Sequence, residues 1–111
     1  MATVKNLKKS GKNFPSPRCK CKTWIEHWDI NRYPNGDYWA TRCRGCGKKI
    51  DHSKLCGGHV IKVDSTDICI YIIPLCSSCN GKEDATFEVE KSDLISANCS
   101  NCVSERDTVE E

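Results

Sequence analysis

The amino-acid sequence predicts a single small α+β domain. A chain of 111 residues with 38% apolar residues can build only one core, and a small one. Four of its ten cysteines form two C-x-x-C pairs, at 43–46 and 76–79, which is the spacing of metal ligands. Short strand-like and helix-like segments surround these pairs. We therefore expect a bound metal to supply much of the stability that so small a core lacks.

The two ends of the chain are polar and predict tails around one folded domain. Residues 1–18 are rich in Lys, Ser, Gly and Pro, so we expect a basic, disordered tail there. Residues 105–111 are mostly acidic, and we expect a frayed end. The folded, metal-binding domain is accordingly predicted to span residues 19–104.

A short helix and a strand are predicted ahead of the first cysteine pair. Trp24 and Trp28 are four residues apart and would share one face of a helix, which we expect to pack in the core. The run Pro34-Asn35-Gly36 is a strong turn signal. Residues 38–42 then predict a short strand that leads into the cysteines.

A β-hairpin is predicted between the two cysteine pairs. Gly57-Gly58 predicts a turn, and the segments 59–63 and 68–73 are both typical of strands. Residues 76–82 are expected to begin a helix or a tight turn. The alternation of apolar and acidic residues at 87–90 predicts one more short strand.

The two C-x-x-C pairs predict one four-sulfur zinc site. A glycine after Cys46 allows a tight turn that aims both sulfurs of the first pair at one ion, and the second pair repeats the spacing. Four thiolates complete a tetrahedral structural site. Such sites contribute on the order of 10 kcal/mol, so removing zinc is expected to unfold a domain of this size. The predicted ligands are Cys43, Cys46, Cys76 and Cys79.

The remaining cysteines leave a second zinc site open. C-K-C and C-S-N-C could bring the two ends of the domain together around another ion, and His27 or His59 could replace one thiolate. Cys56 and Cys69 have no partner at chelating spacing, and we expect them to be small buried apolar side chains. The candidate ligands of the second site are Cys19, Cys21, Cys99 and Cys102.

Charge is distributed unevenly along the chain. Residues 1–22 contain seven Lys or Arg and no acid, whereas residues 57–111 contain four Lys or Arg and eleven Asp or Glu. The basic N-terminal half could therefore contact the phosphates of DNA or RNA, although a solvated tail would have the same composition. The acidic second half leaves a protein partner open as well.

Cysteine usage and the lack of long apolar runs predict a cytoplasmic, soluble protein. The first residues carry lysines with no apolar stretch behind them, so we see no secretory signal. The longest apolar run, Ile68 to Ile73, is far shorter than the roughly 20 residues of a membrane span. Reduced thiols available to zinc fit that compartment. We expect a monomer.

The cysteine pairs and the residues between them resemble a known family. C-x-x-C, then G-G-H-V, then I-I-P-L-C-x-x-C-N-x-K is similar to the zinc-bearing branch of the HNH (His-Me finger) endonucleases, and especially to the phage endonuclease VII type. The resemblance covers Cys43 to Lys82. It implies a treble-clef or ββα-metal module with a short β-hairpin and short helices. It also implies that His59 is a general base and that Asn80 binds catalytic magnesium.

Two departures from this family make a degenerate site the main expectation. Gly58 stands where the family has an aspartate before the histidine, and no asparagine lies just before Cys76. A magnesium ion would then have one neutral oxygen, whereas such sites use at least one carboxylate. Asp51-His52 offers a rival register. We therefore expect an HNH-like zinc module that contacts nucleic acid, with an active endonuclease and a protein-interaction module as the alternatives.

Overall fold

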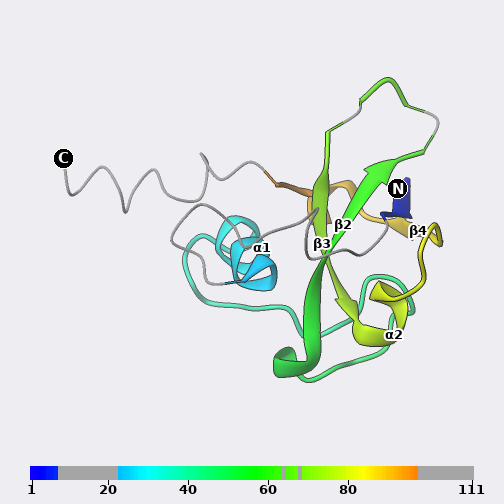
Figure 1. Ribbon diagram of the computed structural model, residues 1–111. Helices are drawn as coiled ribbons and strands as arrows, with labels where there is room; N and C mark the ends of the chain where they lie inside the picture. Colours follow the sequence, from blue (N-terminus) through cyan, green and yellow to red (C-terminus); the bar gives the residue numbers. More distant parts are fainter. Residues whose placement is uncertain (8–22, 64, 68, 98–111) are drawn as a thin grey trace.

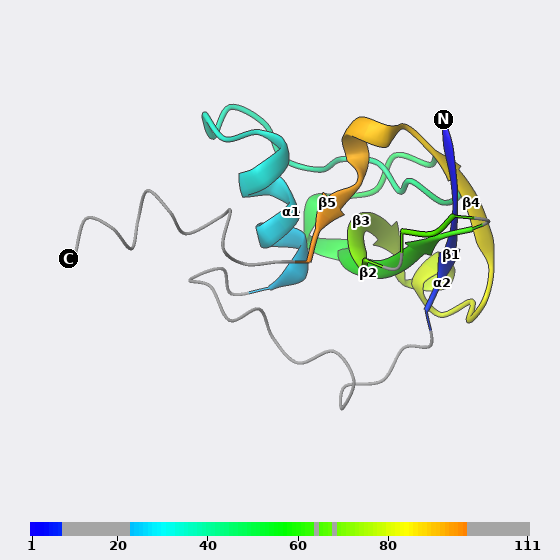
Figure 2. The ribbon, with the colours of Figure 1, turned by 90° about the horizontal axis from the view of Figure 1, so that it is seen from above.

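The structure, a computed structural model, describes residues 1–7, 23–63, 65–67 and 69–97. They form an α+β domain whose centre is a five-stranded antiparallel sheet with the order β4-β1-β2-β3-β5 (Figures 1 and 2). The strands are β1 Ala2–Asn6, β2 Leu55–Lys62, β3 Tyr71–Cys76, β4 Thr86–Val89 and β5 Ile95–Ser96. The helices are α1 Trp24–Arg32 and α2 Ser77–Asn80, and two short 3₁₀ turns cover His52–Lys54 and Lys91–Asp93. The predicted fold class is confirmed.

The N-terminal residues do not match their prediction. Residues 1–18 were expected to be disordered, but Ala2–Asn6 form β1, which lies between β2 and β4. Val4 and Asn6 are almost fully buried, while Thr3 and Lys5 alternate with them on the half-exposed side. β1 is held in the sheet by the burial of Val4 and Asn6 and by backbone pairing with a strand on each side. Residues 8–18 and 105–111, also predicted as tails, lie outside the described residues.

The predicted hairpin is present, but its two glycines lie in a strand and not in a turn. Gly57 and Gly58 belong to β2, which pairs antiparallel with β3 from Leu55 to Val60. A Cβ atom on Gly57 would lie 2.5 Å from the carbonyl carbon of Trp24, and one on Gly58 would lie 2.4 Å from Cδ1 of Leu75. Glycine is therefore needed here for close packing rather than for reversal of the chain.

Helix α1 covers one side of the hairpin, and α2 lies on the other (Figures 1 and 2). Thr23 caps α1, its hydroxyl accepting a hydrogen bond from the Glu26 amide at 3.2 Å. Trp28 is fully buried, as predicted, and its indole N–H donates to the Asp93 carbonyl at 2.8 Å. The helix ends before a turn that contains Gly36 with a positive φ of 78°.

The strand predicted at 38–42 is absent from the described structure. Its only ladder contact is an isolated bridge between Arg42 and Lys49. The Ala40 amide instead donates to Oδ1 of Asp29 on α1, at 2.8 Å. The hydrogen bond that a neighbouring strand would accept from the Ala40 amide is thus accepted by the Asp29 side chain. The strand predicted at 87–90 is confirmed as β4, one residue earlier.

Candidate metal centre

The four predicted ligands meet at one point in the structure. Cys43 and Cys46 belong to a loop, Cys76 ends β3, and Cys79 lies in α2. Their ligand atoms all lie within 4.8 Å of one another. Sulfurs bound tetrahedrally to zinc at about 2.3 Å lie roughly 3.8 Å apart, so a small contraction would close the site around an ion. The four residues therefore fit a structural zinc.

Local hydrogen bonds shape the Cys43–Gly47 loop, which we call the knuckle. The amides of Gly45 and Cys46 donate to the Cys43 sulfur at 3.3 and 3.5 Å. Gly47 has a φ of 78°, and its amide donates to the Cys43 carbonyl at 2.9 Å. The loop is thereby turned so that both sulfurs of this pair lie near those of Cys76 and Cys79.

The knuckle is also attached to the hairpin and to β1. The Arg44 amide donates to the Pro74 carbonyl at 2.8 Å, which fixes the first cysteine pair beside the second. The Asn6 side-chain amide donates to the carbonyls of Asn80 and Lys82, both at 3.0 Å. These bonds hold the short helix that carries Cys79. Sequence reasoning missed Asn6, and the alternation of Val4 and Asn6 was the only signal for it.

The sulfurs are in an environment that favours a thiolate at Cys43. Burial raises the pKa of this thiol, but the backbone amides of Cys46, Cys76 and Gly45, and the Cys79 side chain, outweigh burial and lower it to about 7. Burial, followed by contact with the Cys43 sulfur, raises the pKa of Cys79. The Cys79 thiol thus donates to the Cys43 sulfur, which favours the charged form of Cys43 over that of Cys79. A divalent cation would stabilise the charged form of all four.

We predict that Gly45→Ala will weaken metal binding. A Cβ atom there would lie 2.9 Å from Cε1 of Phe87 and 3.1 Å from the Cys79 sulfur, so the ligand or the ring must move. We expect a loss of about 1 to 3 kcal/mol in stability, and zinc release at lower chelator concentration. The control is Gly81→Ala, whose Cβ would meet nothing closer than 3.3 Å. Equal zinc retention in the two variants would contradict the prediction.

The other cysteines fall into three groups. Cys56 is half-buried beside Leu55 and Trp24, where it lines an apolar hollow of about 380 Å³. Cys69 was expected to be buried but is exposed, because it follows the turn of the hairpin, where its amide donates to Asp67. The candidates for a second site, Cys19, Cys21, Cys99 and Cys102, lie outside the described residues.

His27 of α1 and His59 of β2 both contact the Trp24 ring, between the helix and the sheet. His27 is fully buried, and its Nε2 is 2.8 Å from the Ser96 carbonyl. The Trp24 ring contacts both imidazoles, with centroids 5.1 Å from that of His27 and 4.9 Å from that of His59. Burial, and then electrostatic repulsion by the neighbouring His27 imidazole, lowers the pKa of His59 to about 4. His59 is therefore a neutral, largely buried imidazole at pH 7.

His59 and Asn80 face different sides of the hairpin. A Cβ atom on Gly57 would point at Trp24, the ring that His59 contacts, whereas one on Gly58 would point at Oδ1 of Asn80, 3.2 Å away. Neighbouring residues in a strand point to opposite faces, so β2 separates the two side chains. The geometry does not bring them to one phosphate.

The rival histidine is engaged elsewhere. Nε2 of His52 lies 2.6 Å from a carboxylate oxygen of Asp29, the residue that also anchors Ala40. Asp51 is exposed and accepts a hydrogen bond from Ser53. Asp51 and His52 thus bind different partners and do not form a joint metal site in the described structure.

Comparison with known proteins adds no family to this geometry: no family model, no curated protein and no solved structure matches the chain. Within the described residues, none of the helices has the length and apolar character that crossing a bilayer requires. The metal centre itself is therefore the main guide to function.

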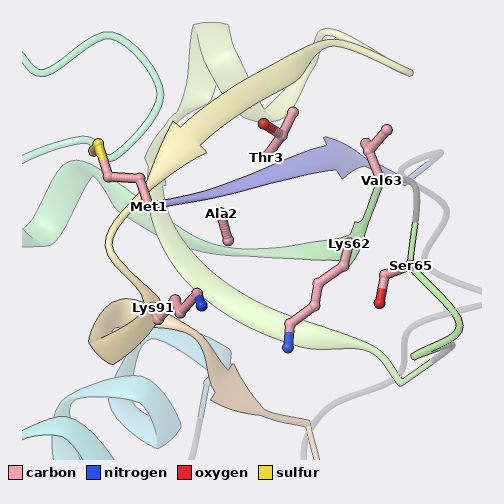
Figure 3. A pocket seen from close by; sticks show the side chains of 7 residues that line it. All are labelled: Met1, Ala2, Thr3, Lys62, Val63, Ser65 and Lys91. Carbon is pink, nitrogen blue, oxygen red and sulfur yellow. The ribbon is translucent and has the colours of Figure 1, made fainter.

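A second hollow, of about 450 Å³, lies beside the first residues of β1 and the last residue of β2 (Figure 3). Lys62 and Lys91 extend over it from two sides, with Ser65 nearby. The Lys62 ammonium lies 3.1 Å from a carboxylate oxygen of Asp67. The Tyr71 hydroxyl, the Cys69 amide and Lys62 hold the pKa of Asp67 below its usual range, so this pair remains ionised. The charge of one of the two lysines over the hollow is thus already neutralised.

Proposed function

We propose that this protein is a zinc-stabilised module that binds nucleic acid without cleaving it. A four-cysteine tetrahedral cluster is typical of structural zinc, with no open position for substrate. The observation that supports nucleic-acid binding is a group of exposed cations on and beside the knuckle. None of them has an ion pair among the described residues. This group, the knuckle cations, consists of Arg42, Lys48, Lys49 and Lys54.

The knuckle brings like charges together. Arg42 and Lys49 are opposite each other in an isolated antiparallel bridge, and Lys48 is adjacent. Like charges in directly opposed positions are destabilising unless an anion lies between or above them. Regularly spaced phosphates would supply that anion. The zinc site in this proposal fixes the spacing of the cations.

We propose that the basic N-terminal half contacts nucleic acid, as its composition predicts. The main contacts come from the knuckle cations and not from residues 1–18. Lys5 lies in β1 and is half-buried, so part of the expected tail is built into the sheet. The knuckle cations belong to the same half of the chain and are fixed by the fold. The acidic residues after β3 would repel phosphate, and one of them, Asp93, is paired with Arg44 of the knuckle at 2.9 Å and so does not compete for the knuckle cations.

The order of knuckle, hairpin and short helix agrees with what the HNH resemblance implies, and a treble-clef arrangement is part of our proposal. Cleavage is not. The family's base and metal ligand correspond to His59 and Asn80, on opposite faces of β2, and an aspartate at position 58 would have to displace the Leu75 side chain, because its Cβ would lie 2.4 Å from Cδ1. A zinc module of this kind would bind nucleic acid and leave its bonds intact.

A second zinc site is the other part of the proposal. Contact between α1 and β5, through His27 and the Ser96 carbonyl, joins the two points from which the chain leads to the remaining cysteines. In the sequence, Cys21 is two residues before Thr23 and Cys99 is two residues after Ala97. A reducing cytoplasm would keep these thiols available, and we propose a monomer.

The salt dependence of binding tests the phosphate contacts. For Lys48→Gln/Lys49→Gln, we expect weaker binding to both a 20-nucleotide single strand and its duplex. The slope of log affinity against log salt should fall by roughly 1.4 on the single strand and 1.8 on the duplex, because two contacts are lost. The matched control is Lys82→Gln, an exposed lysine followed by Glu83 and Asp84, which should leave the slope unchanged.

Two outcomes would contradict this proposal. If the natural protein binds no nucleic acid at low salt, the zinc module serves a protein partner instead. If it cuts DNA in the presence of magnesium and His59→Ala abolishes cutting without loss of zinc, the active-endonuclease alternative is correct.

A further inference from the structure

Two adjacent aromatic side chains are exposed next to the knuckle cations. Tyr38 is 69% and Trp39 56% exposed, and apart from Met1 no other large hydrophobic residue is exposed in the described part of the chain. Burial of one such side chain is worth about 2 to 3 kcal/mol. Two consecutive aromatic side chains remain exposed to solvent instead of being buried, which indicates a binding surface.

The backbone on both sides of this pair is held in place. On the N-terminal side, the Gly36 amide donates to the Tyr33 carbonyl at 2.9 Å, and the ring of Tyr33 contacts that of Tyr38 with centroids 5.5 Å apart. On the C-terminal side, Ala40 is buried and its amide is anchored to Asp29. A ligand would therefore meet aromatic rings whose backbone is already ordered, which lowers the entropic cost of binding.

The chain leads directly from these rings to the cations. Arg42 is three residues after Trp39, a span of about 10 Å in extended chain, and its bridge partner is Lys49. The Arg42 guanidinium donates to the Gly47 carbonyl at 2.9 Å, so it is oriented by the knuckle while its charge stays exposed. Exposed aromatic rings beside a row of cations are the arrangement that binds unpaired bases and their phosphates together.

We propose that Tyr38 and Trp39 stack on the unpaired bases of single-stranded nucleic acid while the knuckle cations bind its phosphates. This rests on the proposed nucleic-acid contact and adds selectivity to it. In a duplex the base faces are already stacked on one another, so only the phosphate contribution remains. The protein should accordingly bind a single strand more tightly than the duplex of the same sequence.

Substitution of Trp39 tests the stacking. Fluorescence anisotropy with a 20-nucleotide single strand and its duplex, at one salt concentration, should show that Trp39→Leu weakens single-strand binding by roughly tenfold. Duplex binding should change by less than about twofold, because phosphate contacts remain. Trp39→Phe, which retains a flat ring, should recover most of the single-strand affinity. Tyr38→Leu should have a similar but smaller effect than Trp39→Leu.

Zinc content and thermal unfolding of each variant confirm that the comparison is between folded proteins, and Tyr38→Leu carries the test if Trp39→Leu does not fold. Equal loss on single strand and duplex, no loss on either, or equal function of the Leu and Phe variants would overturn the stacking proposal. In those three cases the salt-dependent phosphate contact stands. Absence of any binding by the natural protein would overturn both proposals.

Discussion

Cys43→Ser should release the zinc and unfold the domain, whereas Cys69→Ser should do neither. Cys43 is fully buried, and its sulfur accepts hydrogen bonds from the amides of Gly45 and Cys46. It lies beside the three other sulfurs of the cluster. Structural zinc contributes on the order of 10 kcal/mol, which is comparable to the entire stability of a domain of this size. Cys69 is exposed and outside the cluster, so the same exchange there is a matched control.

Elemental analysis of protein purified in a reducing buffer, with circular dichroism before and after chelation, is the measurement. The natural protein and Cys69→Ser should contain zinc and lose their folded spectrum when chelator is added. Two zinc ions per chain would support the second site, and one would reject it. A natural protein that is folded without metal, or that contains iron in place of zinc, would contradict the central assignment.

Val4→Asn should destabilise the protein by about 4 kcal/mol, because an apolar side chain is lost from the core and an amide is left there without partners. Val4 is fully buried at the middle of β1, between β2 and β4. The same residue placed one position later, Lys5→Asn, would point to the half-exposed face and should cost less than about 1 kcal/mol.

Urea denaturation at fixed zinc concentration gives both values. We also expect Val4→Asn to release zinc more readily, because a displaced β1 would withdraw the Asn6 side chain from the carbonyls of α2. If Val4→Asn and Lys5→Asn were equally stable, the N-terminal residues would not belong to the sheet, and the original expectation of a tail would be restored.

The metal site could be predicted from sequence because its information is local. Each C-x-x-C pair fixes its own turn, and a tetrahedral ion needs two such pairs wherever they lie in the chain. Helix α1 could be predicted equally well, because Trp24 and Trp28 are spaced so that they share one face of a helix. The hairpin was found for the same reason, although the glycines of β2 were misinterpreted, since sequence does not reveal that a helix packs against them.

β1 could not be predicted, because the alternation of Val4 and Asn6 within it is too short to indicate a strand. Its partners are more than 50 residues away, and its lysine-rich surroundings have the composition of a solvated segment. The motif also could not predict that His59 and Asn80 lie on different sides of β2. A family pattern gives the order of residues along the chain, but which face of a strand each one occupies depends on register, and a shift of one residue reverses it.

The position of β1 within the sheet also has a consequence for the order of folding. β1 precedes both of its partner strands in the chain, and Val4 pairs with Lys62 on one side and with Phe87 on the other. The two cysteine pairs and the hairpin between them are complete before β4 exists, so zinc can organise that part early. Pairings of such long sequence separation form slowly, and β1 can take its place between β2 and β4 only after residue 89 has been synthesised. Closure of the sheet around β1 is accordingly the late event that we expect to limit the folding rate.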